Sequence, residues 1–208
     1  MGRILGIPGE ELPHVSHYFD EPHRYFRQRL LIVGGKNSAA EAALRCYHAG
    51  ARVTLSYRGA ELPPKSVKYW LLPELLGRIQ RGEIACHYRT APKAISPTHV
   101  TLERFDGGGA IEVEADFVLL LTGYVADPTL LRLAGVELAG ADGAPVFDPK
   151  TMETNVPGLY VAGTVTAGTQ HSYKIFIENC HIHARRIAAA LSGAPPPPDA
   201  APIAVPET

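Results

Sequence analysis

The sequence has few cysteines, and neither sign of charge prevails in it. Its three cysteines, Cys46, Cys86 and Cys180, lie far apart, form no C-x-x-C pair and leave an odd number. Such usage argues against a disulfide scaffold and is typical of a reducing compartment. The 20 Lys and Arg nearly balance the 21 Asp and Glu, so no net field attracts nucleic acid or an anionic membrane. We therefore expect a cytoplasmic protein with no nucleic-acid partner.

Long apolar runs are also lacking. No stretch approaches the roughly 20 apolar residues that a membrane-spanning helix needs. The N-terminal MGRILGIPGEELPHVSH is too acidic, and its apolar run too short, for a signal peptide. No membrane partner is expected. What the sequence does have is a hydrophobic fraction of 46% with 20% charged residues, which is ordinary for a folded globular protein.

Strand and helix patterns alternate between residues 30 and 122. The run LLIVGG predicts a strand and a tight turn, an alanine-rich helix follows from Ser38 to Ala49, and RVTLSY predicts a second strand. PELLGRIQRG then predicts a helix and EIACHYR a strand. HVTLERF, DGGG and AIEVEADFVLLLTGY predict a β-hairpin that runs into a buried strand. The expected fold class is α/β, a Rossmann-like NAD(P)-binding domain with an inserted β-meander.

The flanking segments are less regular. Residues 1–28 predict a connector, because they are rich in Pro, His and Tyr without periodicity. After Tyr124, DPTLLRLAGVEL predicts a short helix, GLYVAG a buried strand and KIFIENCHIHARRIAAALSG a long helix. Residues 192–208 form a Pro/Ala tail that we expect to be disordered. The resulting domain boundaries are 29–124 and 125–191.

The segment VGGKNSAAEAALRCYHAGARVTLSYRG has the outline of a dinucleotide-binding unit. Its glycines allow a sharp turn and close approach of phosphate, and the helix start offers free N–H groups. Lys36 replaces the middle glycine, yet its ammonium can reach a phosphate. Asn37 and Ser38 are predicted to cap the helix and to donate to phosphate oxygens. A flavodoxin-like sheet with an incidental Gly-Gly turn is the alternative. The candidate phosphate-binding residues are Gly34, Gly35, Lys36, Asn37, Ser38 and Ala39.

The end of the second strand favours NADPH over NADH. An acid there usually binds the ribose 2′-hydroxyl of NAD, whereas a cation binds the 2′-phosphate of NADP. No acid occurs between Ala51 and Ala60, and Arg58 is followed by Lys65 and Lys68. The alternative for each of these residues is a solvated surface cation.

Five ordered motifs together resemble the bacillithiol disulfide reductase family, a branch of the thioredoxin-reductase-like flavoproteins. They are the glycine-turn segment above, SVKYWLLP, FVLLLTGY, TNVPGLYVAG and IFIEN. The resemblance implies that the NADPH domain is inserted between two halves of an FAD domain, of which 125–191 is the second, so that the chain carries a partial FAD-binding domain. Arg58 and Lys68 would lie near the adenosine phosphate. The other cofactor-binding residues that it implies are Gly123, Gly163, Thr164 and a helix that begins near Ile175.

The family's first glycine fingerprint, for the FAD phosphates, and its reactive cysteine have no counterpart in these residues. In the family, the position of Met1 would already fall in the connector between the two domains, so we expect an N-terminally truncated relative with an incomplete FAD site. No catalytic residue is identified, and HVSHYFDEP lacks the C-x-x-C of thioredoxin reductases.

The resemblance implies an NADPH-dependent flavoprotein disulfide oxidoreductase with a small-molecule disulfide as substrate. The alternatives are a non-catalytic NADPH-binding module or subunit that needs a partner chain, and a flavin monooxygenase-like fragment. The monooxygenase fits less well, because the motifs after Tyr124 match the disulfide reductases. Apolar faces of the FAD half-site would be exposed, so a homo-oligomer or another association is expected.

The letters CHIH, residues 180–183, would attract a search for metal sites. Cys180 and His183 fall on one face of the predicted helix, but two ligands are too few for a structural zinc ion. We expect no metal, and we expect these side chains to pack against the core.

Overall fold

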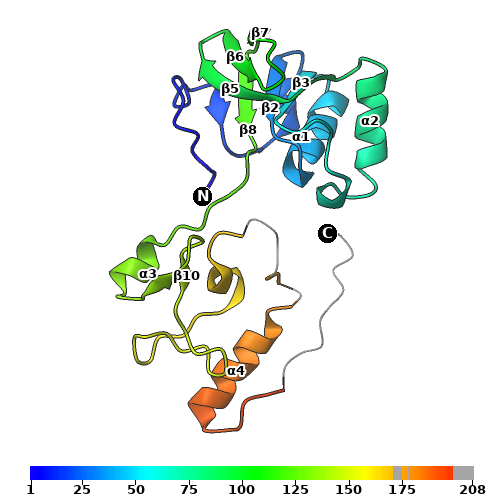
Figure 1. Cartoon of the computed structure of the whole chain (residues 1–208). Coiled ribbons are helices and arrows are strands. Elements are labelled where there is room, and N and C mark those ends of the chain that lie inside the picture. The colour runs from blue at the N-terminus through cyan, green and yellow to red at the C-terminus, as the bar shows by residue number, and fades with distance from the viewer. Residues whose placement is uncertain (171–174, 178, 199–208) are drawn as a thin grey trace. The chain divides into compact units, whose positions relative to one another are not determined.

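The computed structural model describes residues 1–170, 175–177 and 179–198. They fall into two compact units, one made of Gly2–Gly123 and the other of Met1 with the residues from Tyr124 onward (Figure 1). Among the described residues, no helix has the length and apolar character needed to cross a membrane.

The larger unit is built on a parallel sheet of five strands, in the order β1, β8, β2, β3, β4. The strands are β1 (Val15–Ser16), β2 (Arg29–Val33), β3 (Arg52–Tyr57), β4 (Ala85–Tyr88) and β8 (Phe117–Leu120). Each pairs in parallel with its neighbour. Strands β2 and β8 are apolar at nearly every position, as expected for strands that are covered on both faces.

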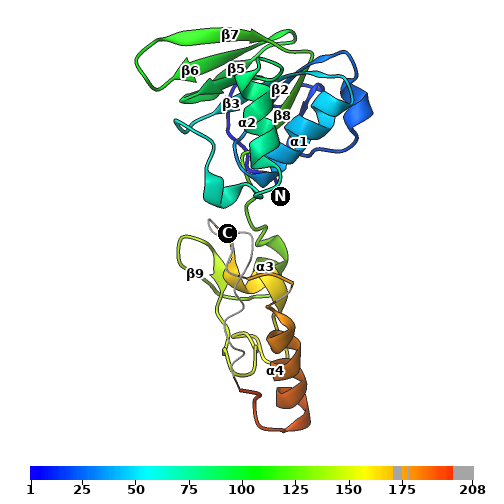
Figure 2. The same ribbon diagram turned by 90° about the vertical axis from the view of Figure 1, so that its right-hand side faces the viewer.

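Helices cover one face of this sheet and a second, smaller sheet covers the other (Figure 2). Leu30 and Ile32 of β2 pack with α1 (Asn37–His48) and α2 (Leu72–Gln80). Leu31 and Val33 point to the opposite face and pack with the antiparallel strands β5 (Thr90–Ile95), β6 (His99–Arg104) and β7 (Ala110–Glu114). The expected α/β class is confirmed, and the meander lies where the sequence predicts it.

Two strands of the larger unit were not predicted. The segment expected to be a connector supplies β1, in which Val15 pairs with Val118 and Ser16 with Leu119, and a 3-10 helix at Pro22–Tyr25. Strand β5 contains Pro92 and has an irregular register there. Proline removes a backbone donor and argues against a strand, so the sequence pattern gave no sign of β5.

The smaller unit contains α3 (Thr129–Leu133), the two-residue strands β9 (Leu138–Ala139) and β10 (Ala144–Pro145), a 3-10 helix at Gly163–Ala167, and α4 (His181–Ser192). The prediction of a buried strand at GLYVAG is wrong. Within the part of the chain that the structure describes, Tyr160 makes one isolated bridge, to Glu153. A strand needs a ladder of partners, and a single bridge does not supply one.

The predicted start of the last helix is also wrong, because α4 begins at His181 rather than near Ile175. The Gln170 side chain accepts from the Ile175 N–H at 2.9 Å and donates to the Ile175 C=O at 3.2 Å. The Asn179 side-chain oxygen accepts from the Phe176 N–H at 2.7 Å. Side chains thus occupy backbone groups that a longer helix would use. Residues 174 and 178 of this prediction, and 199–208 of the predicted tail, lie outside the described residues.

Candidate functional site

Strands β2, β3 and β4 end at the same edge of the parallel sheet. Val33 of β2 pairs with Ser56, and Tyr57 of β3 pairs with Tyr88 of β4. The turn after β2 leads directly into the first helix of the sheet. In open α/β sheets, ligands bind outside the carboxyl ends of the strands. This edge of the larger unit is therefore the candidate nucleotide site.

Gly34 occupies a position that admits no side chain. Its φ is +147°, and a Cβ there would lie 2.4 Å from the Leu121 carbonyl oxygen and 3.0 Å from the Ala39 Cβ. Its N–H donates to the Ser56 C=O at 2.9 Å. The small size of Ala39, which is buried, allows α1 to approach the strands here. Glycine at 34 and alanine at 39 thus let the turn and the start of α1 pack closely against the backbone at Leu121.

Gly35 and Gly59 lie on either side of the Tyr57 ring. A Cβ on Gly35 would come within 2.3 Å of this ring, and one on Gly59 within 2.5 Å. The ring therefore joins the turn after β2 to the turn after β3. Gly35 belongs to the predicted fingerprint, whereas Tyr57 and Gly59 lie outside that pattern and were not predicted.

The start of α1 carries no side-chain cap. Lys36 is the N-cap residue and makes no capping hydrogen bond, so the prediction that Asn37 and Ser38 cap the helix is wrong. Asn37 already belongs to the first helical turn, and its Oδ1 instead accepts from the Lys68 N–H at 2.7 Å. An uncapped helix start keeps N–H groups and a partial positive charge available to an anion. Lys36 and Ser38 are exposed beside it.

Three cations follow β3 along the chain, Arg58 and Lys65 exposed and Lys68 half-buried. Arg58 follows β3 directly, is exposed, and forms no ion pair with a described residue. Lys68 is held next to α1 through its backbone, and its Nζ lies 5.1 Å from the centre of the Trp70 ring. Lys65 lies in the 3-10 helix Pro64–Ser66. The fold thus brings Lys68 and the glycine turn together, and it places Arg58 at the same edge.

The remaining predicted residues lie elsewhere. Gly123, with φ +103°, ends the larger unit after β8. Gly163, Thr164 and Ile175 belong to the smaller unit. Gly163 begins a 3-10 helix with φ +76° and has open space where a Cβ would lie, and Thr164 is exposed.

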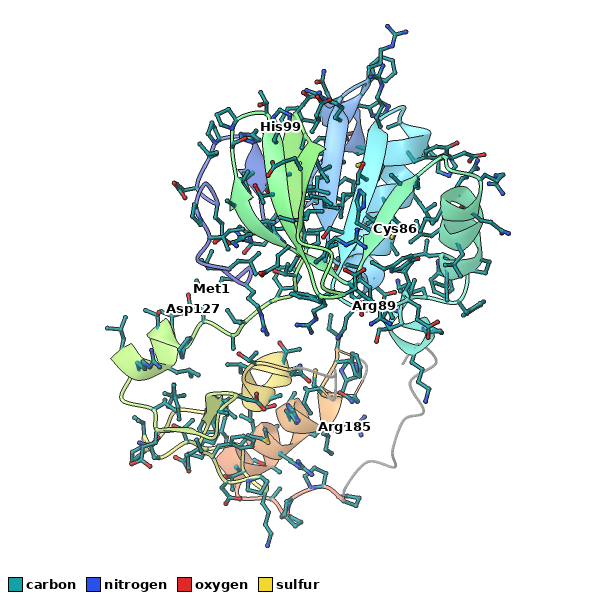
Figure 3. The ribbon with its side chains drawn as sticks, turned by 45° about the horizontal axis from the view of Figure 1, so that its top comes forward. Met1, Cys86, Arg89, His99, Asp127 and Arg185 are labelled. Carbon is teal, nitrogen blue, oxygen red and sulfur yellow. The ribbon has the colours of Figure 1, made fainter. Side chains whose placement is uncertain are left out.

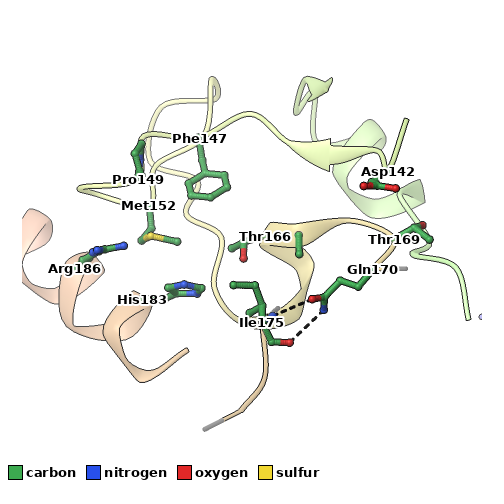
Figure 4. Close-up of a pocket in the computed structure, with 11 residues that line it drawn as sticks. Asp142, Phe147, Pro149, Met152, Thr166, Thr169, Gln170, Ile175, His183 and Arg186 are labelled. Carbon is green, nitrogen blue, oxygen red and sulfur yellow. Dashed lines mark hydrogen bonds between the residues drawn. The ribbon is translucent and has the colours of Figure 1, made fainter. Parts of the chain in front are cut away.

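A cavity of about 450 Å³ lies within the smaller unit (Figure 4). Ile175 and the Gln170 side chain that binds it line this cavity, together with buried His183 of α4. His183 Nδ1 accepts from the Gly163 N–H at 3.0 Å. This contact ties α4 to one of the predicted flavin residues, and nothing in the CHIH pattern indicates it.

Burial, and then the charge of Arg186, lower the pKa of His183. The neutral ring can accept the Gly163 N–H at Nδ1, whereas a protonated ring donates at both nitrogens and cannot. Among the described residues, no three His, Cys, Asp or Glu side chains are grouped as a metal site would need. In the described residues, His183 serves as a buried hydrogen-bond acceptor for the Gly163 N–H.

Acidification is expected to weaken this contact. Because the pKa of His183 is lower in the folded than in the unfolded chain, the unfolded chain binds more protons as the pH falls below about 6.5, so stability is lost in that window. His183→Phe should cost about 1–3 kcal/mol at pH 8 by leaving the Gly163 N–H unpaired. Urea unfolding should show that this loss of unfolding free energy is smaller at pH 5 than at pH 8. The exposed neighbour His181→Phe serves as control, and a His183 cost that is equal at both pH values contradicts the assignment.

The thiols of the larger unit are poorly suited to nucleophilic redox chemistry. Burial raises the pKa of Cys46 to about 12 and that of Cys86, on β4, to about 11. The thiolate is the reactive form of cysteine, so both thiols stay protonated and inert near neutral pH. Cys180, in the smaller unit, donates to the Ile177 C=O at 3.4 Å.

Comparison with known proteins shows the family to which the chain belongs. A sequence profile of the pyridine nucleotide-disulphide oxidoreductases matches residues 2–163, more than half of the chain. The chain belongs to this family. It is 42% identical to bacilliredoxin reductase Bdr of Bacillus subtilis over 188 aligned residues. The alignment covers 90% of this chain and 57% of that protein.

Solved structures extend the comparison. Bacillithiol disulfide reductase Bdr from Bacillus cereus superposes with a TM-score of 0.82 at 38% identity, covering 91% of this chain and 57% of that one. Thioredoxin reductase from Lactococcus lactis, at 22% identity and a TM-score of 0.65 over 83% of this chain and 56% of that one, shares the fold. The resemblance to the bacillithiol disulfide reductases is therefore confirmed. The chain spans a little over half the length of these relatives.

Proposed function

We propose that this chain binds NADPH at the carboxyl edge of its parallel sheet and forms the NADPH-binding part of a flavoprotein disulfide reductase. The observation that carries the proposal is the turn after β2, where a Cβ on Gly34 would collide with the Leu121 backbone. Only glycine fits at position 34, and the uncapped start of α1 follows the turn directly. The two features together suit a pyrophosphate.

The preference for NADPH rests on charge. Arg58 lies where an NAD-binding domain usually carries an acid, and it has no ion-pair partner among the described residues. A 2′-phosphate would supply that partner through charge-assisted hydrogen bonds, which the 2′-hydroxyl of NADH cannot form with the same strength.

The residues of the smaller unit suit one half of an FAD site. Gly163 presents an open backbone with exposed Thr164 beside it, and His183 fixes the Gly163 amide. When bound, FAD supplies the redox chemistry, and the share of this chain is to hold and orient the nicotinamide cofactor. Since Arg58 follows the second strand of the unit that contains the glycine turn, we assign that turn to NADPH.

The proposed substrate is a small-molecule disulfide. The Bacillus cereus relative is named for bacillithiol disulfide and the Bacillus subtilis relative for bacilliredoxin. The three cysteines form no disulfide with one another, which suits a cytoplasmic location. The raised pKa values of Cys46 and Cys86 disfavour the thiolate that disulfide exchange needs.

A two-step experiment tests this function. First, the 208-residue chain is titrated with NADPH and with NADH by nicotinamide fluorescence, and tighter binding of NADPH is expected. Second, the chain is mixed with FAD, NADPH and bacillithiol disulfide, with and without the part of Bacillus subtilis Bdr that it does not match. We expect stable flavin absorbance and NADPH oxidation only in the complemented mixture, since half a site binds FAD weakly.

Each outcome separates the candidates. NADPH binding without turnover in the complemented mixture would favour a non-catalytic binding module. Transfer of one oxygen atom from O₂ to an added organic substrate, with the other released as water and no disulfide reduced, would favour a flavin monooxygenase-like chemistry. Sedimentation of the chain with and without the complementing part tests the proposed self-association. A homo-oligomer that forms through the FAD half-site should dissociate when the complementing part is added. Failure to bind either nicotinamide cofactor would contradict the proposal as a whole.

A further inference from the structure

Arg89 has an unusual backbone conformation directly after β4. Its φ is +54°, in the left-handed region that residues other than glycine rarely adopt. Two backbone hydrogen bonds hold it there, from the Arg89 N–H to the Gly59 C=O at 2.9 Å and from the Phe105 N–H to the Arg89 C=O at 2.8 Å. Figure 3 labels Arg89 at the end of this strand. Glycine would adopt this positive φ without strain. The backbone conformation therefore gives no reason for an arginine at this position.

The pairing of the strands brings Arg89 next to Arg58. Tyr57 of β3 is opposite Tyr88 of β4, and each arginine follows its tyrosine directly. The hydrogen bond to Gly59 joins Arg89 to the residue after Arg58. Two guanidinium groups thus leave neighbouring strands at the edge of the sheet where the nucleotide is proposed to bind.

Neither of these two arginines has an acidic partner among the described residues, and the same holds for Arg27 and Arg52 at the amino ends of the strands, whereas some other arginines of the larger unit are paired. Arg29 pairs with Asp116 and Glu114, Arg78 with Glu83 and Glu74, and Arg104 with Asp106. Both Arg58 and Arg89 are exposed and free of ion pairs. An anion that binds between two exposed cations at this edge is attracted by both. A phosphate group, with three acceptor oxygens, can receive hydrogen bonds from both.

We propose that Arg89 is a second specificity-determining residue, which binds the 2′-phosphate of NADPH together with Arg58. This inference rests on the proposed function, since it assigns a further residue to the same nucleotide site. Arg58 then provides one cation after β3 and Arg89 the other after β4.

Four variants of the full 208-residue chain test the proposal, with Arg58→Glu serving as the reference for the site itself. Arg89→Gln should weaken NADPH binding roughly ten-fold and leave NADH binding unchanged, because a hydrogen bond to a charged group is lost for one cofactor alone. Arg89→Lys should restore part of the affinity. Arg89→Gly should lose the same NADPH affinity as Arg89→Gln while its melting temperature rises, because glycine relaxes the backbone.

Arg27 offers a matched control. Its φ is +59°, its N–H donates to the Gly50 C=O at 3.0 Å, and it precedes β2 at the opposite edge of the sheet. Arg27→Gln removes the same charge from the same backbone conformation and should leave the NADPH to NADH ratio unchanged. Adenosine 2′,5′-bisphosphate and 5′-AMP serve as a second pair of probes, which differ only in the 2′-phosphate.

Three results would overturn the inference. Equal loss of NADPH and NADH affinity in Arg89→Gln would mean that Arg89 acts through the fold. An unchanged NADPH affinity in Arg89→Gln, with selectivity lost in Arg58→Glu, would leave the proposed function standing and refute the role of Arg89 alone. Absence of binding of either cofactor to the unmodified chain would refute both.

Discussion

The Arg58→Glu variant is expected to lose about ten-fold to a hundred-fold in NADPH affinity and with it the preference for NADPH over NADH. A charge-assisted bond between Arg58 and the 2′-phosphate is worth roughly 1.5–3 kcal/mol, and a carboxylate in its place also repels that phosphate. NADH, which lacks this phosphate, should bind the variant as well as it binds the unmodified chain, or better, because the new acid can accept from its 2′-hydroxyl. Fluorescence titration with both cofactors gives the two dissociation constants.

Arg52→Glu provides the control for this measurement. Arg52 is exposed at the amino end of β3, whereas Arg58 follows the carboxyl end of the same strand. The two variants carry the same change in net charge, so a general field effect would appear in both. If the unmodified chain binds the two cofactors equally, or if Arg52→Glu lowers NADPH affinity as much as Arg58→Glu, the assignment of the 2′-phosphate to Arg58 fails.

The central unit of the fold could be predicted because local signals agree there with tertiary packing. In β2, the apolar run Leu30–Val33 is buried on both faces, and the alanine-rich α1 packs against it. Glycine is required at Gly34 by the collision that any Cβ would meet. Sequence patterns report such positions well, because the residue type and the backbone conformation depend on each other.

Other elements depend on partners that the local sequence does not reveal. Strand β1 consists of Val15 and Ser16, and its order comes from pairing with β8, about a hundred residues further along the chain. The GLYVAG segment shows the reverse, since its apolar pattern predicts a strand but the described residues offer it one bridge. Strand formation is set by tertiary contacts more than by local propensity.

The candidate site was predictable to a similar degree. Arg58 could be found because it occupies a fixed place after the second strand of a known pattern. Arg89 could not, since its relevance depends on the register of Tyr57 with Tyr88 and on a positive φ, and neither is visible in the letters HYRT. The bond between His183 and Gly163 was hidden for the same reason, because it joins positions that are twenty residues apart.

Substitution of Gly34 by alanine is expected to have the largest effect on stability. The new Cβ would lie 2.4 Å from the Leu121 carbonyl oxygen, which is a backbone atom of the strand region beside the turn and cannot rotate away. The φ of +147° adds strain for any side chain. Together, overpacking and backbone strain should cost about 3–5 kcal/mol, a large part of the stability of an ordinary domain. Urea unfolding would measure the loss, and NADPH titration would show weakened binding even where the chain remains folded.

Two further glycine variants separate the causes of this loss. Gly82, with φ +73°, has open space where a Cβ would lie, so Gly82→Ala should show the backbone cost alone, about 1 kcal/mol. Gly35→Ala meets the Tyr57 ring at 2.3 Å, and adding Tyr57→Ala should recover part of its loss because a side chain can be removed. Gly34→Ala cannot be rescued in this way, since its obstacle is the main chain. If Gly34→Ala proves no more destabilising than Gly82→Ala, then the turn has room for a side chain, and the close approach of backbone to phosphate loses its structural basis.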